Sequence, residues 1–134
     1  MKYIVLLGRI LYSMIFMLAS LGHFTGKTIA YAAAQGVPFA QFVVPLSGVM
    51  ALLGGLSIAL GYKTKYGALL LVLFLVPVTV MLHKFWTVTD PIMAQMQLAM
   101  FMKNTALIGG AFMIMHFGTG PLSLDARPTA SRLR

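Results

Sequence analysis

The sequence contains no cysteine and no glutamate, and Asp90 and Asp125 are its only carboxylate side chains. Without cysteine the chain has no disulfides, thiol relays, iron–sulfur ligands or thiolate metal sites. So few carboxylates leave a transition metal short of hard ligands, so we expect no metal site. No serine is evidently set beside a histidine and a carboxylate, and no glycine-rich phosphate loop precedes a helix. The residues therefore contain no self-contained catalytic motif and leave open whether the chain is an enzyme.

Charge is also scarce, since only 9% of the 134 residues are charged and 60% are hydrophobic. Soluble domains usually carry about a quarter charged residues. Four apolar runs approach the roughly 20 residues that cross the hydrocarbon of a bilayer. The sequence therefore predicts an all-α polytopic membrane protein, a four-helix bundle within residues 1–126 followed by a basic tail at 118–134. The predicted spans are residues 3–22, 42–60, 67–82 and 98–117.

The net charge of +8 sits at the ends of the apolar runs. The basic residues are not interleaved with aromatic residues, so we do not expect nucleic acid as a partner. We expect membrane lipids as partners instead. The side that holds both termini is the more basic one, which predicts cytoplasmic termini and a cytoplasmic tail. The longer loops, 23–41 and 83–97, then face outward, and Thr28–Gln35 predicts a short interfacial helix. The basic residues on the predicted cytoplasmic side are Lys2, Arg9, Lys63, Lys65, Arg127, Arg132 and Arg134.

Small residues recur at helical spacing in two of the predicted spans. They permit close approach of backbones, on which helix association in lipid depends. The pattern fits packing within the chain or formation of a homo-oligomer, and it does not distinguish them. The predicted packing residues are Ser47, Ala51, Gly55 and Ala59 in the second span, with Ala106 and Gly110 in the fourth.

Polar side chains mark one face of the first span and the outer end of the bundle. Arg9, Ser13, Ser20 and His23 point in similar directions on a helix, so Arg9 either turns inward or snorkels to the head groups. At the outer end a polar pocket is expected, although Trp86 also fits an interfacial belt and Lys103 a helix bridge. Its donors suit a quinone head group, a lipid phosphate or a small oxyanion. The predicted ligand-binding residues are His83, Trp86, Gln97, Lys103, Asn104, Arg9 and His23.

Several short motifs, in this order, resemble the DoxX family of small bacterial membrane proteins. They are Gly8-Arg9, Gly22, YAAAQGVP at 31–38, His83 with Phe85-Trp86, Gln97, Phe101, Lys103-Asn104, Gly109-Gly110 and the tail motif GPLSLD at 120–125. The resemblance implies a four-helix bundle in the bacterial inner membrane, related to the small membrane subunit of thiosulfate:quinone oxidoreductases. No cofactor is established by the residues; the resemblance makes a quinone the candidate cofactor and a redox subunit a candidate partner.

Two functions therefore stand as hypotheses. The first is a subunit or accessory of a quinone-linked membrane redox system with an outer-leaflet polar pocket. The alternative is a non-enzymatic module that binds lipid or assists assembly of a membrane complex.

Overall fold

The computed structural model describes residues 1–126, and every regular element in that range is helical. The prediction of an all-α chain is confirmed. Of the predicted tail, only residues 118–126 belong to the described part, so Arg127, Arg132 and Arg134 lie outside it. The elements are α1 (Lys2–Gly22), α2 (Gly26–Ala34), α3 (Ala40–Leu60), α4 (Thr64–Leu82), the short 3₁₀ helix η1 (Phe85–Thr87) and α5 (Pro91–Phe117).

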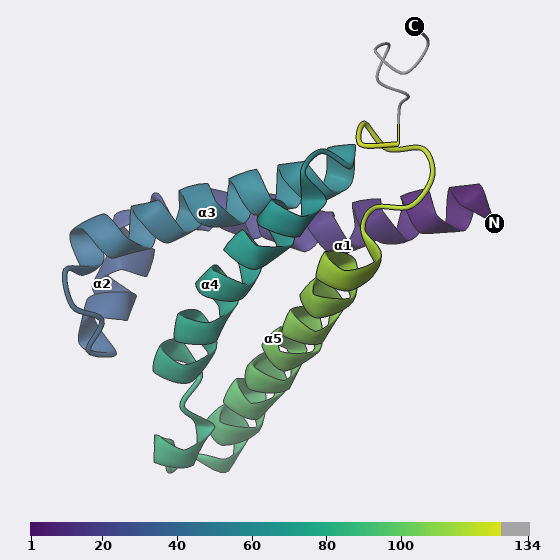
Figure 1. The fold of residues 1–134 in the computed structure, drawn as a ribbon. Coiled ribbons are helices and arrows are strands. Elements are labelled where there is room, and N and C mark those ends of the chain that lie inside the picture. Colours follow the sequence, from purple (N-terminus) through teal and green to yellow (C-terminus); the bar gives the residue numbers. More distant parts are fainter. Residues whose placement is uncertain (127–134) are drawn as a thin grey trace, which may run out of the picture.

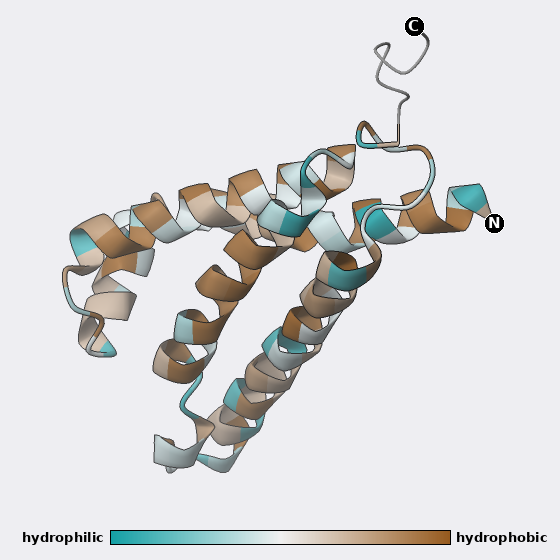
Figure 2. Ribbon diagram, viewed as in Figure 1, coloured by the Kyte–Doolittle hydropathy of each residue, from teal (hydrophilic) through white to brown (hydrophobic). Residues whose placement is uncertain are grey.

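Four of these helices, α1, α3, α4 and α5, are long and apolar enough to cross a membrane. Hydrophobic residues recur along the whole length of these helices (Figure 2). Large side chains such as Leu18, Phe42 and Leu73 are more than half exposed on them. Such a surface is unfavourable in water and suits a surrounding of lipid.

The fourth span begins earlier than the sequence indicated. Residues 91–97 belong to a loop in the sequence-based prediction, but in the structure they are helical, because α5 starts at Pro91. Asp90 caps the helix by accepting a hydrogen bond from the Met93 N–H at 2.8 Å, and Pro91 supplies a first-turn residue that needs no partner for its nitrogen. The 27 residues of α5 extend about 40 Å, so the helix is longer than the hydrocarbon it crosses.

The long helices pack in an open arrangement (Figure 1). α3 contacts α1 on one side and α4 on another, and α4 contacts α5. The α4–α5 pair diverges from the α1–α3 pair toward the end that carries α2 and η1. We call that end the distal end, and the opposite end, with Met1, the α3–α4 loop and residues 118–126, the terminal end. α1 is also tied to α5 by a hydrogen bond of 2.6 Å from the Tyr12 hydroxyl to the Leu107 carbonyl.

The polar face predicted for α1 is confirmed, because Arg9, Ser13 and Ser20 are all buried. Arg9 turns inward. The serine hydroxyls donate to carbonyls of their own helix, Ser13 to Arg9 and Ser20 to Met17, each at 2.7 Å. Polar groups on this face therefore find their acceptors inside the protein, as a lipid surrounding demands.

Small residues allow α3 to approach both of its neighbours. Of the predicted packing residues, Ala51 and Gly55 are buried, and a side chain at Gly55 would meet Met17, Phe16 and Ser13 of α1. Gly110 lies against the Tyr12 ring, whereas Ala106 is exposed. The small-residue pattern did not indicate the α3–α4 contact, where Gly54 and Gly67 face each other closely.

Residues 118–126 fold back onto the terminal end, which the sequence did not indicate for this tail. The Leu124 N–H donates to the Leu60 carbonyl, and the Asp125 N–H to the Gly61 carbonyl at 2.8 Å. The Asp125 carboxylate accepts from the backbone N–H groups of Lys63 and Thr64, at 3.0 and 3.4 Å. It therefore caps α4 from a distant part of the chain.

Replacement of Gly67 by alanine tests the α3–α4 contact. A Cβ there would lie 2.5 Å from the Ser57 Cβ, so we expect Gly67→Ala to lower the free energy of unfolding by about 1–3 kcal/mol, the usual cost of overpacking. Gly109→Ala is the matched control, because no atom outside its own helix lies near that position and alanine favours a helix. Denaturant titration in detergent measures both, and equal stability of the two variants would contradict the contact.

Removal of the Asp125 carboxylate tests the cap on α4. We expect Asp125→Ala to lower the free energy of unfolding by about 1 kcal/mol, because the N–H groups of Lys63 and Thr64 at the start of α4 lose their acceptor. Asp125→Asn keeps an acceptor oxygen and should lose less. Thermal unfolding in detergent distinguishes the variants, and an alanine variant as stable as the wild type would show that the cap contributes nothing.

Candidate functional site

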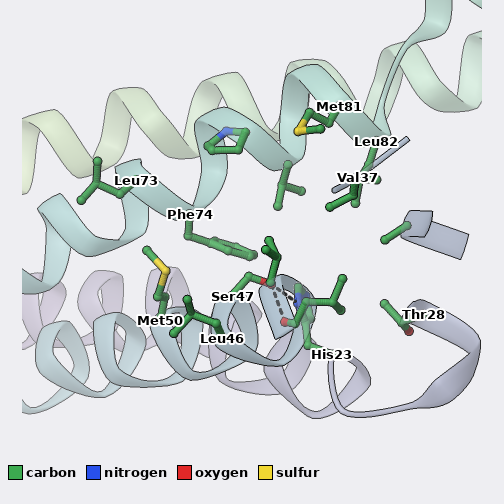
Figure 3. Close-up of a pocket in the computed structure, with 15 residues that line it drawn as sticks. His23, Thr28, Val37, Leu46, Ser47, Met50, Leu73, Phe74, Met81 and Leu82 are labelled. Carbon is green, nitrogen blue, oxygen red and sulfur yellow. Dashed lines mark hydrogen bonds between the residues drawn. The ribbon is translucent and has the colours of Figure 1, made fainter. Parts of the chain in front are cut away.

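An apolar cleft lies at the distal end between α2 and α3 on one side and α4 on the other (Figure 3). We call it the His23 cleft. Its volume is about 140 Å³, close to that of engineered apolar cavities that stay dry and bind benzene. Leu46 and Leu73 line it and are more than half exposed, so the cleft opens sideways onto the lipid-facing surface. Its only polar lining residues are His23, Thr28 and Ser47.

A short hydrogen-bond chain forms the polar part of the cleft. The Ser47 hydroxyl donates to the Val44 carbonyl at 2.6 Å, and the His23 Nδ1 lies 2.8 Å from the Ser47 Oγ. Because serine has one proton and gives it to Val44, we assign the proton between His23 and Ser47 to Nδ1. The neutral imidazole then has a lone pair at Nε2 and acts there as an acceptor.

The position of His23 favours this neutral form. The residue follows the last turn of α1, and its ring lies 5.5 Å from that of Phe74 between centroids. Burial lowers the pKa of His23 below its ordinary value of 6.5, although a hydrogen bond with the Val44 backbone acts in the opposite direction. At neutral pH the cleft therefore contains an uncharged acceptor.

A second polar group lies between α4 and α5 at the distal end. His83 Nδ1 is 2.9 Å from the Gln97 Oε1, so two of the predicted site residues are bonded to each other. Beside them Lys84 donates to the Gln35 carbonyl at 3.2 Å, which links the α4–η1 connection to the end of α2.

Trp86 packs in an aromatic cluster. Its ring lies 5.1 Å from Phe85 and 6.1 Å from Phe101 between centroids, all in edge-to-face geometry. Because more than half of Trp86 is exposed, the arrangement also fits an interfacial aromatic residue.

Lys103 and Asn104 point apart. Asn104 is buried, whereas Lys103 is exposed with its Nζ 3.4 Å from the Met100 Sδ, toward the distal end. That direction is typical of a lysine that snorkels to the membrane surface. Arg9 is buried at the terminal end. The seven predicted ligand residues are thus distributed over both ends of the molecule, and His23 is the one that lines the His23 cleft.

No group of three or more histidine, cysteine or acidic side chains that could hold a metal ion occurs within residues 1–126. The lining of the His23 cleft offers apolar contacts and the acceptor of His23.

The SURF4 family model matches residues 1–129. The chain belongs to the SURF4 family. Two inner membrane proteins of Escherichia coli are similar over nearly their whole length. YqjF is 32% identical over 123 residues, 90% of this chain and 88% of YqjF. YphA is 26% identical over 126 residues, 92% of this chain and 89% of YphA.

A more distant relative comes from yeast. The ER-derived vesicles protein ERV29 of Saccharomyces cerevisiae is 29% identical over 79 residues, which are 59% of this chain and 25% of ERV29. No solved structure matches the SURF4 chain. The family and the four apolar helices together identify an integral membrane protein.

The resemblance to the DoxX family was wrong, because the matching family is SURF4. The motifs behind it, such as Gly8-Arg9 and Gly109-Gly110, are short. They reflect general needs of membrane helices, glycine for packing and basic or aromatic residues near the boundaries. The quinone cofactor and the redox partner lose the support that this resemblance gave them.

Acidification tests the neutral state of His23. The pKa of His23 is lower in the folded chain than in the unfolded chain. At a pH below the pKa of the unfolded chain, the unfolded chain therefore binds more protons than the folded one. We therefore expect stability that is constant above about pH 6.5 and falls as the pH drops below it. Urea unfolding between about pH 7 and pH 5 measures this, and His23→Gln should flatten the dependence. His116→Gln, at an exposed position, is the control, and an equal fall in the wild type and His23→Gln would contradict the assignment.

Proposed function

We propose that this SURF4 protein is a non-enzymatic lipid-binding protein that holds one chain of a membrane lipid in the His23 cleft. The observation that supports the proposal most strongly is the side opening of an apolar cavity into the lipid-facing surface, with one histidine acceptor in its wall. In hydrocarbon an empty cavity loses dispersion contacts, and a lipid chain is the apolar group at hand to restore them.

The polar wall narrows the lipid class. His23 and Ser47 use their own donors on each other and on Val44, so the imidazole offers an acceptor. It matches a lipid with an O–H or N–H group near its chain, such as a glycerol hydroxyl or an ethanolamine ammonium. A quinone head group carries carbonyl acceptors and matches this wall poorly, which favours the lipid-binding function over the quinone-linked one.

The proposal places the protein in a bacterial inner membrane with both termini in the cytoplasm and α2 at the opposite interface. Two relatives are named as inner membrane proteins. Lys2, Lys63 and Lys65 at the terminal end support the orientation by the positive-inside rule. The short helix α2 has a Thr25 cap and lies outside the four spans, as an interfacial helix would.

A matched pair of tryptophan variants tests lipid binding. Leu46→Trp places a bulky indole ring in the cleft. Leu53→Trp places the same ring two turns further along the same face of α3, outside the cleft. Both leucines are more than half exposed, so neither change overfills the core. We expect native mass spectrometry of protein from mild detergent to show a retained lipid on the wild type and Leu53→Trp.

In Leu46→Trp the retained lipid should fall by about tenfold, the effect of about 1.4 kcal/mol of binding free energy. Equal retention by the two variants would contradict binding in the cleft. Ubiquinone as the retained molecule would contradict the acceptor assigned to His23 and support the redox function instead.

A further inference from the structure

Arg9 is a buried cation whose partners are all neutral. Its Nη1 donates to the Thr119 carbonyl at 3.0 Å, and its Nη2 donates to the carbonyls of Leu122 at 2.8 Å and Ala59 at 3.4 Å. The residue is 6% exposed. Its Nε is buried and has no hydrogen-bond partner within the described residues. These three hydrogen bonds use three of the five guanidinium N–H groups, and Nε is the one nitrogen left without any partner in this part of the chain.

The carboxylate side chains of the chain are committed elsewhere. Asp125 accepts from backbone groups at the start of α4, and Asp90 caps α5 at the distal end. A buried charge with carbonyl partners alone remains unfavourable until an anion neutralises it. Within residues 1–126 no carboxylate is left for Arg9, so an external anion would complete the site.

A cavity of about 550 Å³ beside Arg9 provides the space. It is lined on α1 by Leu6 and Arg9, on α3 by Ala59 and Leu60, and in the returning tail by residues 122–124 and Ala126. Leu60, Leu122 and Leu124 are exposed, so the cavity is open at the terminal end. A single guanidinium surrounded by leucine side chains matches an amphiphile with an anionic head group and an apolar body.

We propose that this cavity binds the phosphate group of an anionic phospholipid. The positive charge of the Arg9 guanidinium attracts the phosphate, an unused guanidinium N–H donates to a phosphate oxygen, and the leucines contact the glycerol backbone and the first part of the acyl chains. The site is separate from the His23 cleft, which lies at the opposite end of the molecule, so either can fail without the other. Its lipid is selected by the negative charge of the phosphate, whereas the His23 cleft selects a hydrogen-bond donor.

The test supplies a carboxylate from within the protein. Leu6 precedes Arg9 by three residues on α1, so the carboxylate of Leu6→Glu would reach the guanidinium and take the place of the phosphate. Ile4→Glu is the control, because it adds the same charge on the exposed side of the same turn and does not line the cavity. Thermal unfolding in detergent is measured with added phosphatidylglycerol, with phosphatidylcholine and with inorganic phosphate.

Phosphatidylglycerol at about ten times its Kd should raise the Tm of the wild type and Ile4→Glu by about 4 °C. Leu6→Glu should show no rise, and phosphatidylcholine should have no effect on any variant. An equal rise in Leu6→Glu, or an equal effect of phosphatidylcholine, would overturn the site. A full rise with inorganic phosphate alone would overturn the lipid as its source.

A second variant covers the case in which Leu6→Glu does not fold. Arg9→Lys keeps the positive charge but loses the Nε–H and the planar fork, so most of the rise should disappear. Lys65→Gln removes an exposed charge at the same end and should leave the rise unchanged. If Arg9→Lys responds as the wild type does, the Arg9 site is refuted, and if Lys65→Gln loses the rise, general surface charge is its cause.

Discussion

Polar groups inside a bilayer must find their partners within the protein, because hydrocarbon offers none. This constraint accounts for most of the described hydrogen bonds of the long helices. Ser13, Ser20 and Thr79 each donate to a carbonyl of the preceding turn, and Tyr12 reaches across to the Leu107 carbonyl of α5. Two polar atoms that keep unused capacity, His23 Nε2 in the distal cleft and Arg9 Nε at the terminal end, lie at the places where we propose ligands.

The same constraint explains why the sequence predicted the spans well. Hydrophobic length and the scarcity of charge identify four crossings without knowledge of tertiary contacts. The start of α5 was missed because Asp90 and Pro91 look like loop residues until their capping role is seen. The return of residues 118–126 was missed because the hydrogen bonds of Arg9 with Thr119 and Leu122 join residues more than 100 positions apart.

The site was predictable only in part, for a similar reason. Helical spacing placed Arg9, Ser13 and Ser20 on one face, and they are indeed buried together. Spacing could not show that Ser47 bonds to His23, since that contact depends on how closely α3 approaches α1 beside Gly48. Nor could it show that Lys103 and Asn104 diverge, because neighbouring residues on a helix point about 100 degrees apart and the partner helices decide which one is buried.

Membership of the SURF4 family identifies a membrane protein, and we propose that its His23 cleft holds lipid. A high-resolution structure of the protein in a lipid nanodisc tests this most directly. The account predicts density for one acyl chain between α3 and α4, with a donor atom of the lipid within about 3.2 Å of His23 Nε2. A cleft closed by contact of α4 with α2 and α3, with no lipid between them, would contradict it.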